Sequence, residues 1–366
     1  MLNADQLESV AALRRGLHLC PELSGREERT MAAISAFLRE RTSLEVQNMG
    51  GWLLATHWEG EDLPWIGFRA DMDAIPCDEA ACGARHGCGH DGHSAILCGL
   101  GMMLEGARLG RNVHLIFQGA EETGEGARRV CETWPRLDKL ERVYALHNIP
   151  GFPKGAVLMR EGCFACASCG LIVRVKGRPA HAAYPAEGAN PIALLSRLAL
   201  EVRDMAQDVL AGGNRLLMVT LIGIRAGGEN FGLSASEGQL NLTLRGHSKA
   251  DIDALIRRIR AWTEAGCAQE GMKCAFELRD EFCDTTNDDA AYADALSRFA
   301  AAGLSVATLR EPMRWSEDFG WFLKRVPGLY FGIGAGEDWP GLHTAAFEFD
   351  DGLIPIALRA LWALCR

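Results

Sequence analysis

One eight-residue stretch, His86-Gly87-Cys88-Gly89-His90-Asp91-Gly92-His93, constrains the fold more than any other part of the chain. It holds four potential metal ligands and an aspartate, and its glycines let the backbone turn tightly among them. Imidazole, thiolate and carboxylate are the donors that bind Zn²⁺ and similar ions. A loop with structural histidines and a buried cysteine is the alternative, but three histidines beside a cysteine and an aspartate favour a metal site.

A ligand cluster of this kind needs further ligands from elsewhere in the chain. Three candidate groups each follow an apolar run, namely Glu121-Glu122, His147 and His343. In α/β folds, ligands gather at the carboxyl ends of the strands. We therefore expect these side chains to meet the cluster at one edge of a sheet.

The composition narrows the classes of protein to which the chain can belong. The chain has 366 residues, of which 48% are hydrophobic and 23% charged, which is enough for two domains with their own cores. The formal net charge of −10 argues against nucleic-acid binding. No apolar run reaches the length of about 18 residues that predicts a membrane span, and residues 1–15 lack the order of a signal peptide. The 13 scattered cysteines predict a reducing cytoplasm.

The periodicity of apolar residues predicts two kinds of domain. Helices are expected at 4–20 and 94–105, and Ser24 with Glu27 three residues later predicts a capping box at the start of another. Strands alternating with helices indicate an α/β domain with a largely parallel sheet. From about residue 169 the pattern becomes β-α-β-β-α-β, which is typical of a ferredoxin-like domain. We expect an inserted domain at 169–278 and a discontinuous catalytic domain at 1–168 and 279–366.

Two acidic pairs are candidates for chemistry. Glu121 and Glu122 are adjacent, so one carboxylate can bind metal while the other moves protons, which suits the hydrolysis of amides. A solvated acidic turn is the alternative. Asp71 and Asp73 also follow an apolar strand, and one of them could accept a hydrogen bond from a ligand histidine and fix its tautomer. An Asx turn before Pro76 explains this pair equally well.

The predicted insertion carries weaker signals. His181 lies in a loop and could stabilise the oxyanion that forms on a hydrolysed carbonyl. Arg245 ends a strand and could bind a substrate carboxylate through two hydrogen bonds. A surface histidine and a solvated arginine are the alternatives. Cys163, Cys166 and Cys169 resemble part of an iron–sulfur motif, but position 173 is valine where a fourth cysteine would be needed.

Taken together, these residues resemble a known family. The segments that match are Asp71-Met72-Asp73-Ala74-Ile75-Pro76, Cys88-Gly89-His90-Asp91-Gly92-His93, Phe117-Gln118 leading to Glu121-Glu122, His147 and Leu342-His343. They resemble the di-metal amidohydrolases, which include N-acyl-amino-acid amidohydrolases, hippurate hydrolases and auxin-conjugate hydrolases among the aminoacylase and carboxypeptidase-G-like zinc peptidases. The match covers essentially the whole chain in order, and includes Glu317-Asp318.

The resemblance implies a role for each matching residue. The metal ligands would be Cys88, His90, Glu122, His147 and His343, with Cys88 bridging or flanking two divalent ions. Glu121 would be the general base, and His181 would stabilise the oxyanion, often in the site of a second subunit. Asn230 and Arg245 would hold the carboxylate of the substrate. The inserted domain would serve as a lid and commonly form a homodimer.

The chain departs from the family pattern near the substrate. The usual Pro-His pair after the lid histidine is replaced by Ala183-Tyr184-Pro185, and the usual Asn-Val-Ile-Pro is Asn230-Phe231-Gly232-Leu233. Gly87 replaces an alanine, and Gly119 replaces a proline before the glutamates. All the metal ligands are kept. The departures therefore concern the identity of the substrate rather than metal-dependent hydrolysis.

The sequence thus predicts a metal-dependent amidohydrolase that cleaves N-acyl or N-aroyl amino acids, or similar small conjugates, to a carboxylate and an amino acid. A metallo-dipeptidase or carboxypeptidase on the same scaffold is the nearest alternative. A non-catalytic metal-dependent binding protein is another, although the Glu121-Glu122 pair offers a spare base that a binder would not need. Thiolate and imidazole suit Zn²⁺, but a site with carboxylate also accepts Mn²⁺, Co²⁺ or Ni²⁺.

Overall fold

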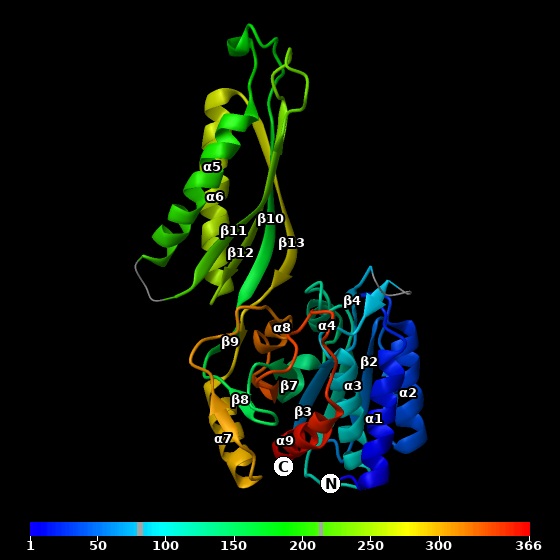
Figure 1. Ribbon diagram of the computed structural model, residues 1–366. Coiled ribbons are helices and arrows are strands. Elements are labelled where there is room, and N and C mark those ends of the chain that lie inside the picture. The colour runs from blue at the N-terminus through cyan, green and yellow to red at the C-terminus, as the bar shows by residue number, and fades with distance from the viewer. Residues whose placement is uncertain (79–82, 212–214) are drawn as a thin grey trace. The chain divides into compact units, whose positions relative to one another are not determined.

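The computed structural model describes residues 1–78, 83–211 and 215–366, which form two compact units. Unit 1 comprises Met1–Phe164, Thr285–Pro312 and Glu317–Arg366, and unit 2 comprises Ala165–Asp284 and Met313–Ser316 (Figure 1). Unit 2 therefore extends a few residues beyond 169–278 on both sides, and it also takes in a short stretch near residue 315.

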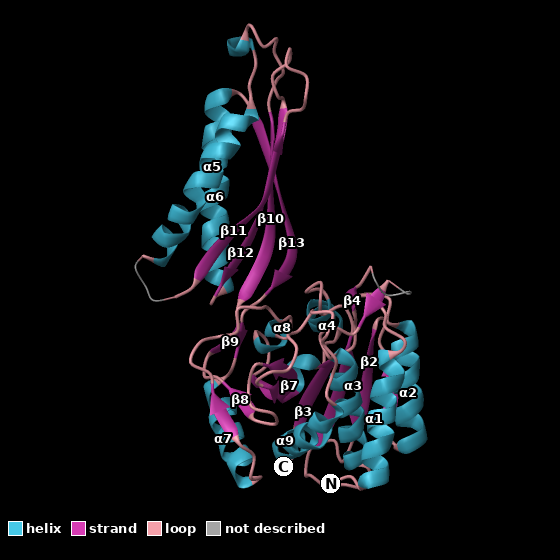
Figure 2. Ribbon diagram, viewed as in Figure 1, coloured by secondary structure: helices cyan, strands magenta, loops and turns pink. Residues whose placement is uncertain are grey.

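A central sheet with the strand order β1-β2-β6-β3-β7-β16-β8-β15 runs through unit 1 (Figure 2). Its strands are β1 (Glu45–Asn48), β2 (Trp52–His57), β3 (Trp65–Asp71), β6 (Asn112–Gln118), β7 (Leu140–Pro150), β8 (Val157–Met159), β15 (Val306–Thr308) and β16 (Gly328–Gly336). Strand β3 is parallel to β6 and β7, β7 to β16, and β8 to β15, whereas β1–β2, β2–β6 and β8–β16 are antiparallel. The predicted largely parallel central sheet is confirmed.

The helices of unit 1 pack on this sheet and on one another. They are α1 (Ala4–His18), α2 (Glu28–Arg41), α3 (His90–Leu104), α4 (Gly126–Thr133), α7 (Asp289–Ala301), α8 (Gly320–Leu323) and α9 (Ile354–Cys365). Helix α3 is buried along its whole length, because α1, α2 and α9 cover it and β3 lies against it. The short strands are β4 (Ile75–Pro76), β5 (Ala84–Arg85), β9 (Cys163–Ala165) and β14 (Thr285–Thr286).

Two local predictions were wrong near the predicted site. Helix α3 begins at His90 rather than at residue 94, so the second half of the histidine cluster is helical and not a loop. Ser24 and Glu27 do not form a capping box, and α2 begins at Glu28 without a side-chain cap. Instead the Ser24 hydroxyl donates to Asp73 Oδ2 at 2.7 Å, and Glu27 Oε1 accepts from Ala120 N at 2.8 Å. Both side chains thus bond to distant residues, and Glu27 Oε1 also accepts from the nearby Gly25 N at 2.8 Å.

Unit 2 is a four-stranded antiparallel sheet with two helices. Along the chain its elements are β10 (Ala167–Lys176), α5 (Pro191–Leu210), β11 (Leu217–Ala226), β12 (Glu237–Gly246), α6 (Lys249–Glu270) and β13 (Lys273–Phe282). The sheet order is β11-β12-β10-β13, so the first and last strands are neighbours at one side of the sheet. Both helices lie on the same face of this sheet in Figure 1, and they share one apolar core with it.

Two further features concern the whole described chain. None of the helices within the described ranges combines the length and apolarity needed to cross a bilayer. No disulfide joins the cysteines in these ranges, and most of them are buried. Residues 79–82 and 212–214 lie outside the described part of the chain.

Candidate metal centre

The candidate ligands of unit 1 gather where its parallel strands end. Strand β3 ends at Asp71, and β6 ends at Gln118, just before the two glutamates. His147 lies within β7, which continues to Pro150 instead of ending at the histidine. His343 reaches the same place from a turn after β16, where its backbone N–H donates to Gly87 O at 2.8 Å. The structure thus brings together all five ligands that the resemblance implies.

Two unusual backbone conformations shape this edge of the sheet. Gly89, which precedes α3, has a φ of 98°, and a Cβ there would lie 2.2 Å from Asn148 Oδ1. Glycine adopts this left-handed backbone conformation without strain, and its lack of a side chain leaves room for Asn148. Ala120 has a φ of 56°, which is uncommon for a residue with a side chain. Its N–H is held by Glu27, and the turn directs the following Glu121 into the site.

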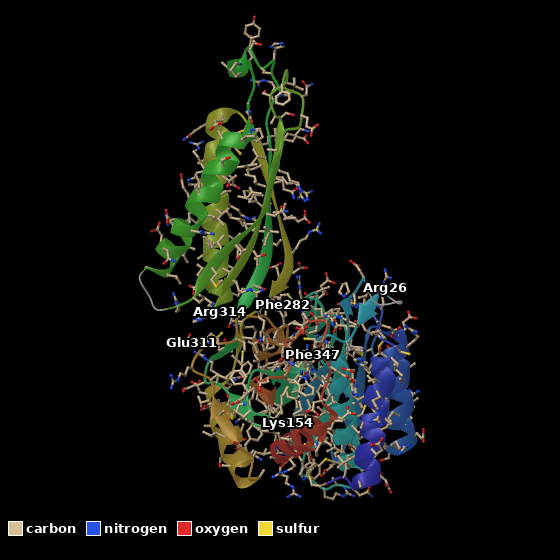
Figure 3. The ribbon with its side chains drawn as sticks, viewed as in Figure 1. Arg26, Lys154, Phe282, Glu311, Arg314 and Phe347 are labelled. Atoms are coloured by element: carbon tan, nitrogen blue, oxygen red, sulfur yellow. The ribbon has the colours of Figure 1, made fainter. Side chains whose placement is uncertain are left out.

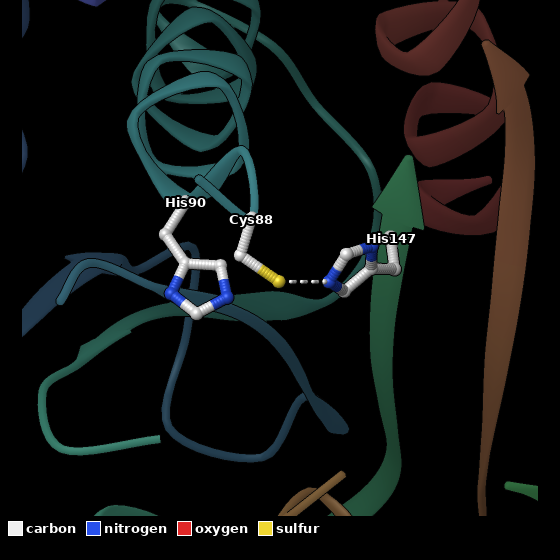
Figure 4. A group of neighbouring side chains, drawn as sticks. All are labelled: Cys88, His90 and His147. Atoms are coloured by element: carbon white, nitrogen blue, oxygen red, sulfur yellow. Dashed lines mark hydrogen bonds between the residues drawn. The ribbon is translucent and has the colours of Figure 1, made fainter. Parts of the chain in front are cut away.

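Cys88 belongs to two groups of potential ligands. Its first group contains His90 and His147, and its second contains Glu122 and His343; in each group the ligand atoms lie within 4.8 Å of one another. The Cys88 Sγ atom is 3.4 Å from His147 Nε2, and His90 faces the same space from the start of α3 (Figure 4). On the other side, His343 Nε2 is 3.4 Å from Glu122 Oε1. One thiolate can therefore contribute to two neighbouring cation sites.

The ligand atoms fit a bound cation on their own chemistry. His90 Nε2 and Glu122 Oε1 are buried, and neither has a hydrogen-bond partner within the described residues. Leaving a buried polar atom unpaired costs roughly 1–3 kcal/mol, so such atoms require an explanation. Both face the space that Cys88 shares, and a divalent cation would satisfy them. A set of thiolate, imidazole and carboxylate donors suits that role.

The protons on these groups compete with a cation. Burial, together with the charge of Glu122, raises the pKa of the Cys88 thiol. The close approach of Cys88 and Glu122 raises the pKa of His343 to about 10. Burial, reinforced by His93, holds the pKa of His147 well below its usual value. Because metal ligands must be deprotonated, cation binding here would release protons and weaken at low pH.

Glu121 lies beside the ligands in an acidic environment. It is 5% exposed, and its Oε2 is 3.8 Å from His90 Nε2. Carboxylate oxygens of Glu317 and Asp318 lie within 4.8 Å of its own. Burial raises the pKa of Glu121 well above its usual value, and the charges of Glu317, Glu122 and Asp318 act in the same direction. A carboxylate of raised basicity beside a cation site can accept and return a proton.

Asp71 and Asp73 both contact histidines of the cluster. Asp71 Oδ1 is 2.6 Å from His93 Nδ1. The hydrogen bond at His90 Nδ1 is with the backbone O of Asp73 at 3.0 Å, and Asp73 Oδ1 lies 3.3 Å from the same nitrogen. The second oxygen of Asp73 accepts from Ser24 Oγ and from the backbone N–H of Glu122. Burial disfavours ionisation of Asp71, but His90, His93 and Arg69 outweigh it and hold the pKa of Asp71 well below its usual value. Asp73 is thus placed to orient a ligand histidine, while Asp71 orients His93.

A buried arginine network supports this edge, and the sequence analysis did not assign it a role. Arg69 Nη1 donates to Asp71 Oδ2 at 2.7 Å, and its Nη2 donates to Asp318 Oδ1 at 2.7 Å. Glu317 is 3.1 Å from the same guanidinium and accepts from Tyr330 Oη at 2.6 Å. The local signal was a charged residue inside the apolar strand 65–71, and its partner Asp318 lies 249 positions away along the chain.

The remaining candidates belong to unit 2, where they do not form one cluster. His181 is paired with Leu233, near Asn230, and both candidate side chains are exposed. Arg245 lies near the opposite end of β12, where its Nη1 donates to Arg314 O at 2.7 Å and to Ser316 Oγ at 2.9 Å. Arg314 is labelled in Figure 3. Within unit 2, therefore, His181 and Asn230 share one end of the sheet and Arg245 occupies the other.

Comparisons with known proteins agree with this geometry. The model of the family described as Peptidase family M20/M25/M40 matches residues 67–366. An N-acetylcysteine deacetylase of Bacillus subtilis is 28% identical over 361 residues, covering 94% of this chain and 93% of the relative. An N-acetyldiaminopimelate deacetylase of Shouchella clausii is 29% identical over 381 residues, covering 98% of each.

A solved structure extends the likeness to three dimensions. The YxeP protein of Bacillus subtilis, described as a dinuclear metal binding peptidase of the M20 family, is 26% identical with a TM-score of 0.81. The match covers 100% of this chain and 98% of that one. The chain belongs to the M20/M25/M40 peptidase family. It is a hydrolase of amide C–N bonds, as the resemblance in its sequence predicted.

Proposed function

We propose that the chain hydrolyses the amide bond of N-acetyl amino acids, or of similar small N-acyl or N-aroyl amino acids, to a carboxylate and a free amino acid. The observation that carries this proposal is Cys88, which is common to two ligand groups, with the buried Glu121 beside them. Such an arrangement offers two cation sites and a spare base in one place. The acetyl group is suggested by relatives that are named as deacetylases.

In this proposal two divalent ions are held by Cys88, His90, Glu122, His147 and His343. Zn²⁺ and Mn²⁺ are the first candidates, and Co²⁺ and Ni²⁺ are others. When bound, the ions supply Lewis-acid chemistry that polarises a carbonyl and acidifies water. Asp73 orients the His90 ring through the hydrogen bond between His90 Nδ1 and the Asp73 backbone O.

Glu121 carries the proton transfers. Its carboxylate accepts the proton of the attacking water, and its raised basicity in the acidic surroundings of Glu317 and Asp318 favours this step. The same proton is then given to the nitrogen of the leaving amine. Because Glu121 is almost fully buried, little bulk water competes for that proton.

Unit 2 would supply the groups that recognise the substrate. We assign oxyanion stabilisation to His181 and the substrate carboxylate to Asn230 and Arg245. Because Arg245 lies at the opposite end of β12 from the other two, one copy of unit 2 is poorly arranged to give all three to one substrate. A homodimer, in which two copies of unit 2 contribute, resolves this difficulty.

The edge strand β11 supports dimer formation through unit 2. It is the outermost strand of its sheet, and Leu221, Ile222 and Ile224 are exposed on it. An exposed apolar edge strand tends to pair with another chain. That no disulfide joins the described cysteines supports the predicted cytoplasmic location.

The first experiment measures amino-acid release from N-acetylcysteine, N-acetyldiaminopimelate, N-benzoylglycine and free dipeptides. It uses metal-stripped protein with Zn²⁺ or Mn²⁺ added back. Glu121→Gln should bind metal normally and lose turnover by roughly 10²–10⁴-fold, as expected for a general base. Glu125→Gln, which alters an exposed glutamate of the same connection, is the matched control and should keep full activity.

Each of the other outcomes has a definite meaning. Normal turnover by Glu121→Gln would refute the assigned mechanism. Release from dipeptides alone would favour the peptidase alternative. Tight binding of an N-acyl amino acid to metal-loaded protein without any release would favour a binding protein.

A further inference from the structure

A second hollow lies at the other end of the catalytic sheet. It has a volume of about 380 Å³ and is lined by Trp58, Glu61, Trp65, His114, Arg136 and Lys139. Trp65 is the first residue of β3 and His114 is near the start of β6, whereas the metal centre follows the ends of these strands. At about 3.3 Å per residue, a strand of this length separates the two places by about 20 Å. The hollow is therefore independent of the metal centre.

The floor of the hollow is a rigid stack of aromatic rings. The Trp65 indole stacks on the His114 ring with centroids 4.3 Å apart and an interplanar angle of 17°. Trp134 packs edge-on against the other side of His114 at 5.1 Å. The Nδ1 atom of this histidine lies 3.1 Å from Thr56 Oγ1, which fixes the ring in its plane. Because these rings are already ordered, ligand binding to them would cost little conformational entropy.

The wall of the hollow leaves an aromatic ring in solvent. Trp58 is 64% exposed, although an indole is among the largest apolar side chains. A flat ligand lying between this indole and the Trp65 floor would bury the exposed ring surface. Indole faces favour flat aromatic partners in offset stacking. Two indole side chains of the lining, Trp58 and Trp65, are therefore available to a planar ring.

The rim of the hollow is cationic in a chain whose net charge is −10. Arg136 and Lys139 are both exposed, and within the described residues neither has a carboxylate at ion-pair distance. Glu61 is the one acidic residue among the lining side chains. Burial, with the charge of Arg136, lowers the pKa of His114 to about 4, so the floor is neutral at pH 7. The two cations are thus available for an anionic group.

We propose that this hollow is a second small-molecule site of the protein and that its ligand is a planar aromatic carboxylate. The ring would lie between Trp58 and Trp65, and the carboxylate would meet Arg136 and Lys139. Its volume falls within the range of about 300–1,000 Å³ that is usual for small-molecule sites. An aromatic platform beside unpaired cations matches both parts of such a ligand.

The test is a calorimetric titration of the metal-loaded full-length protein with 1-naphthoate. The uncharged 1-naphthamide and the non-aromatic cyclohexanecarboxylate serve as ligand controls, and both should bind at least about tenfold more weakly. Trp58→Ala and Arg136→Gln each change an exposed side chain, so both variants should fold, and each should weaken 1-naphthoate binding by roughly tenfold or more. Leu200→Ala, at an exposed leucine of unit 2, should leave binding unchanged.

His343→Ala separates this hollow from the metal centre. Binding of 1-naphthoate that survives in His343→Ala and is weakened in Trp58→Ala supports the proposal. Binding that survives in Trp58→Ala and is lost in His343→Ala would place the ligand at the metal centre and overturn it. The absence of 1-naphthoate binding to the unsubstituted protein would overturn it as well. Trp58→Ala should also retain amide hydrolysis, and its loss would contradict the independence of the two sites.

Discussion

The candidate residues of unit 1 and those of unit 2 differ in how firmly the protein holds them. His90, His93 and Asp71 are buried, and contacts from several elements fix each of them. His181 and Asn230 are exposed, and their side chains accept hydrogen bonds from the backbone of their own loops, at Ala183 N and Gly232 N.

This difference indicates that the candidate residues of the two units serve different functions in the site. A metal centre requires ligands held within a fraction of an ångström, and the core positions Cys88, His90 and His147 in this way, whereas His343 lies on an exposed turn. Groups that contact the substrate can lie on loops and take up their final arrangement when the substrate or a partner surface is present. Substitutions in unit 1 should therefore affect stability as well as activity, whereas those in unit 2 should affect activity alone.

The largest expected effect is that of Arg69→Met. This substitution leaves Asp71, Glu317 and Asp318 buried without their shared cation. Removing one partner of a buried charge network costs about 3–5 kcal/mol of the free energy of unfolding. Chemical denaturation would measure it. Arg258→Met, which removes an exposed arginine that pairs with Asp208, is the control and should change stability far less. If both variants lost the same free energy of unfolding, the inferred difference between buried and exposed positions would be contradicted.

The second prediction concerns His181→Ala. If His181 stabilises the oxyanion, kcat should fall by roughly 10²–10³-fold, as for the loss of one such donor. The thermal midpoint and the bound metal should not change, because the side chain is exposed and its ring contacts Ala183 N and Tyr184 of its own loop. A variant that lost metal or unfolded early would show that unit 2 is coupled to the centre of unit 1 more tightly than we infer.

The third prediction is a pH effect from His114, which is 3% exposed. Burial lowers its pKa to about 4 in the folded protein, against about 6.5 in the unfolded chain. Because the unfolded chain binds the proton first, the stability from the neutral ring is complete above pH 6.5 and is lost as the pH falls towards 4.

This loss amounts to about 3 kcal/mol. The difference in free energy of unfolding between the unsubstituted protein and His114→Phe should therefore vary with pH in this window. A difference that is independent of pH would contradict the assignment.

The smallest expected effect is that of Arg245→Lys. A lysine keeps the charge but loses the paired donors that suit a carboxylate, so KM should rise about tenfold while kcat stays within about twofold. Steady-state kinetics on an N-acyl amino acid would measure both values. A fall in kcat at constant KM would instead indicate that Arg245 matters through its hydrogen bonds to Arg314 O and Ser316 Oγ.

The positions of the candidate metal ligands were predictable because their signals are local. Cys88 and His90 lie in a short run of unusual composition, and Glu122 follows an apolar strand, so residue type and strand ends were sufficient to group them. The parallel sheet followed from the alternation of strands and helices. The relative placement of His181 and Arg245 was not predictable in this way, since it depends on which ends of the strands the connecting loops join.

The errors fall where long-range contacts override local preferences. Ser24 and Glu27 have the spacing of a capping box, but hydrogen bonds to Asp73 and Ala120 take both side chains. Helix α3 begins four residues earlier than predicted, although glycine disfavours helix, because its first turn is buried and held by contacts with distant residues. The Arg69 network joins strand β3 to Asp318, and no local pattern links such distant positions.

The neighbouring first and last strands of unit 2 have a consequence for the evolution and engineering of the chain. Ser168 on β10 pairs with Phe282 on β13, so the polypeptide enters and leaves this part through points about 5 Å apart. A domain inserted at such closely spaced points can be lengthened, exchanged or removed at a small entropic cost of loop closure. The flanking chain needs only a few residues to connect the two points. A shortened enzyme in which a short turn replaces 169–281 should keep Cys88 before α3 and His147 within β7. The insertion could then be exchanged to alter substrate choice.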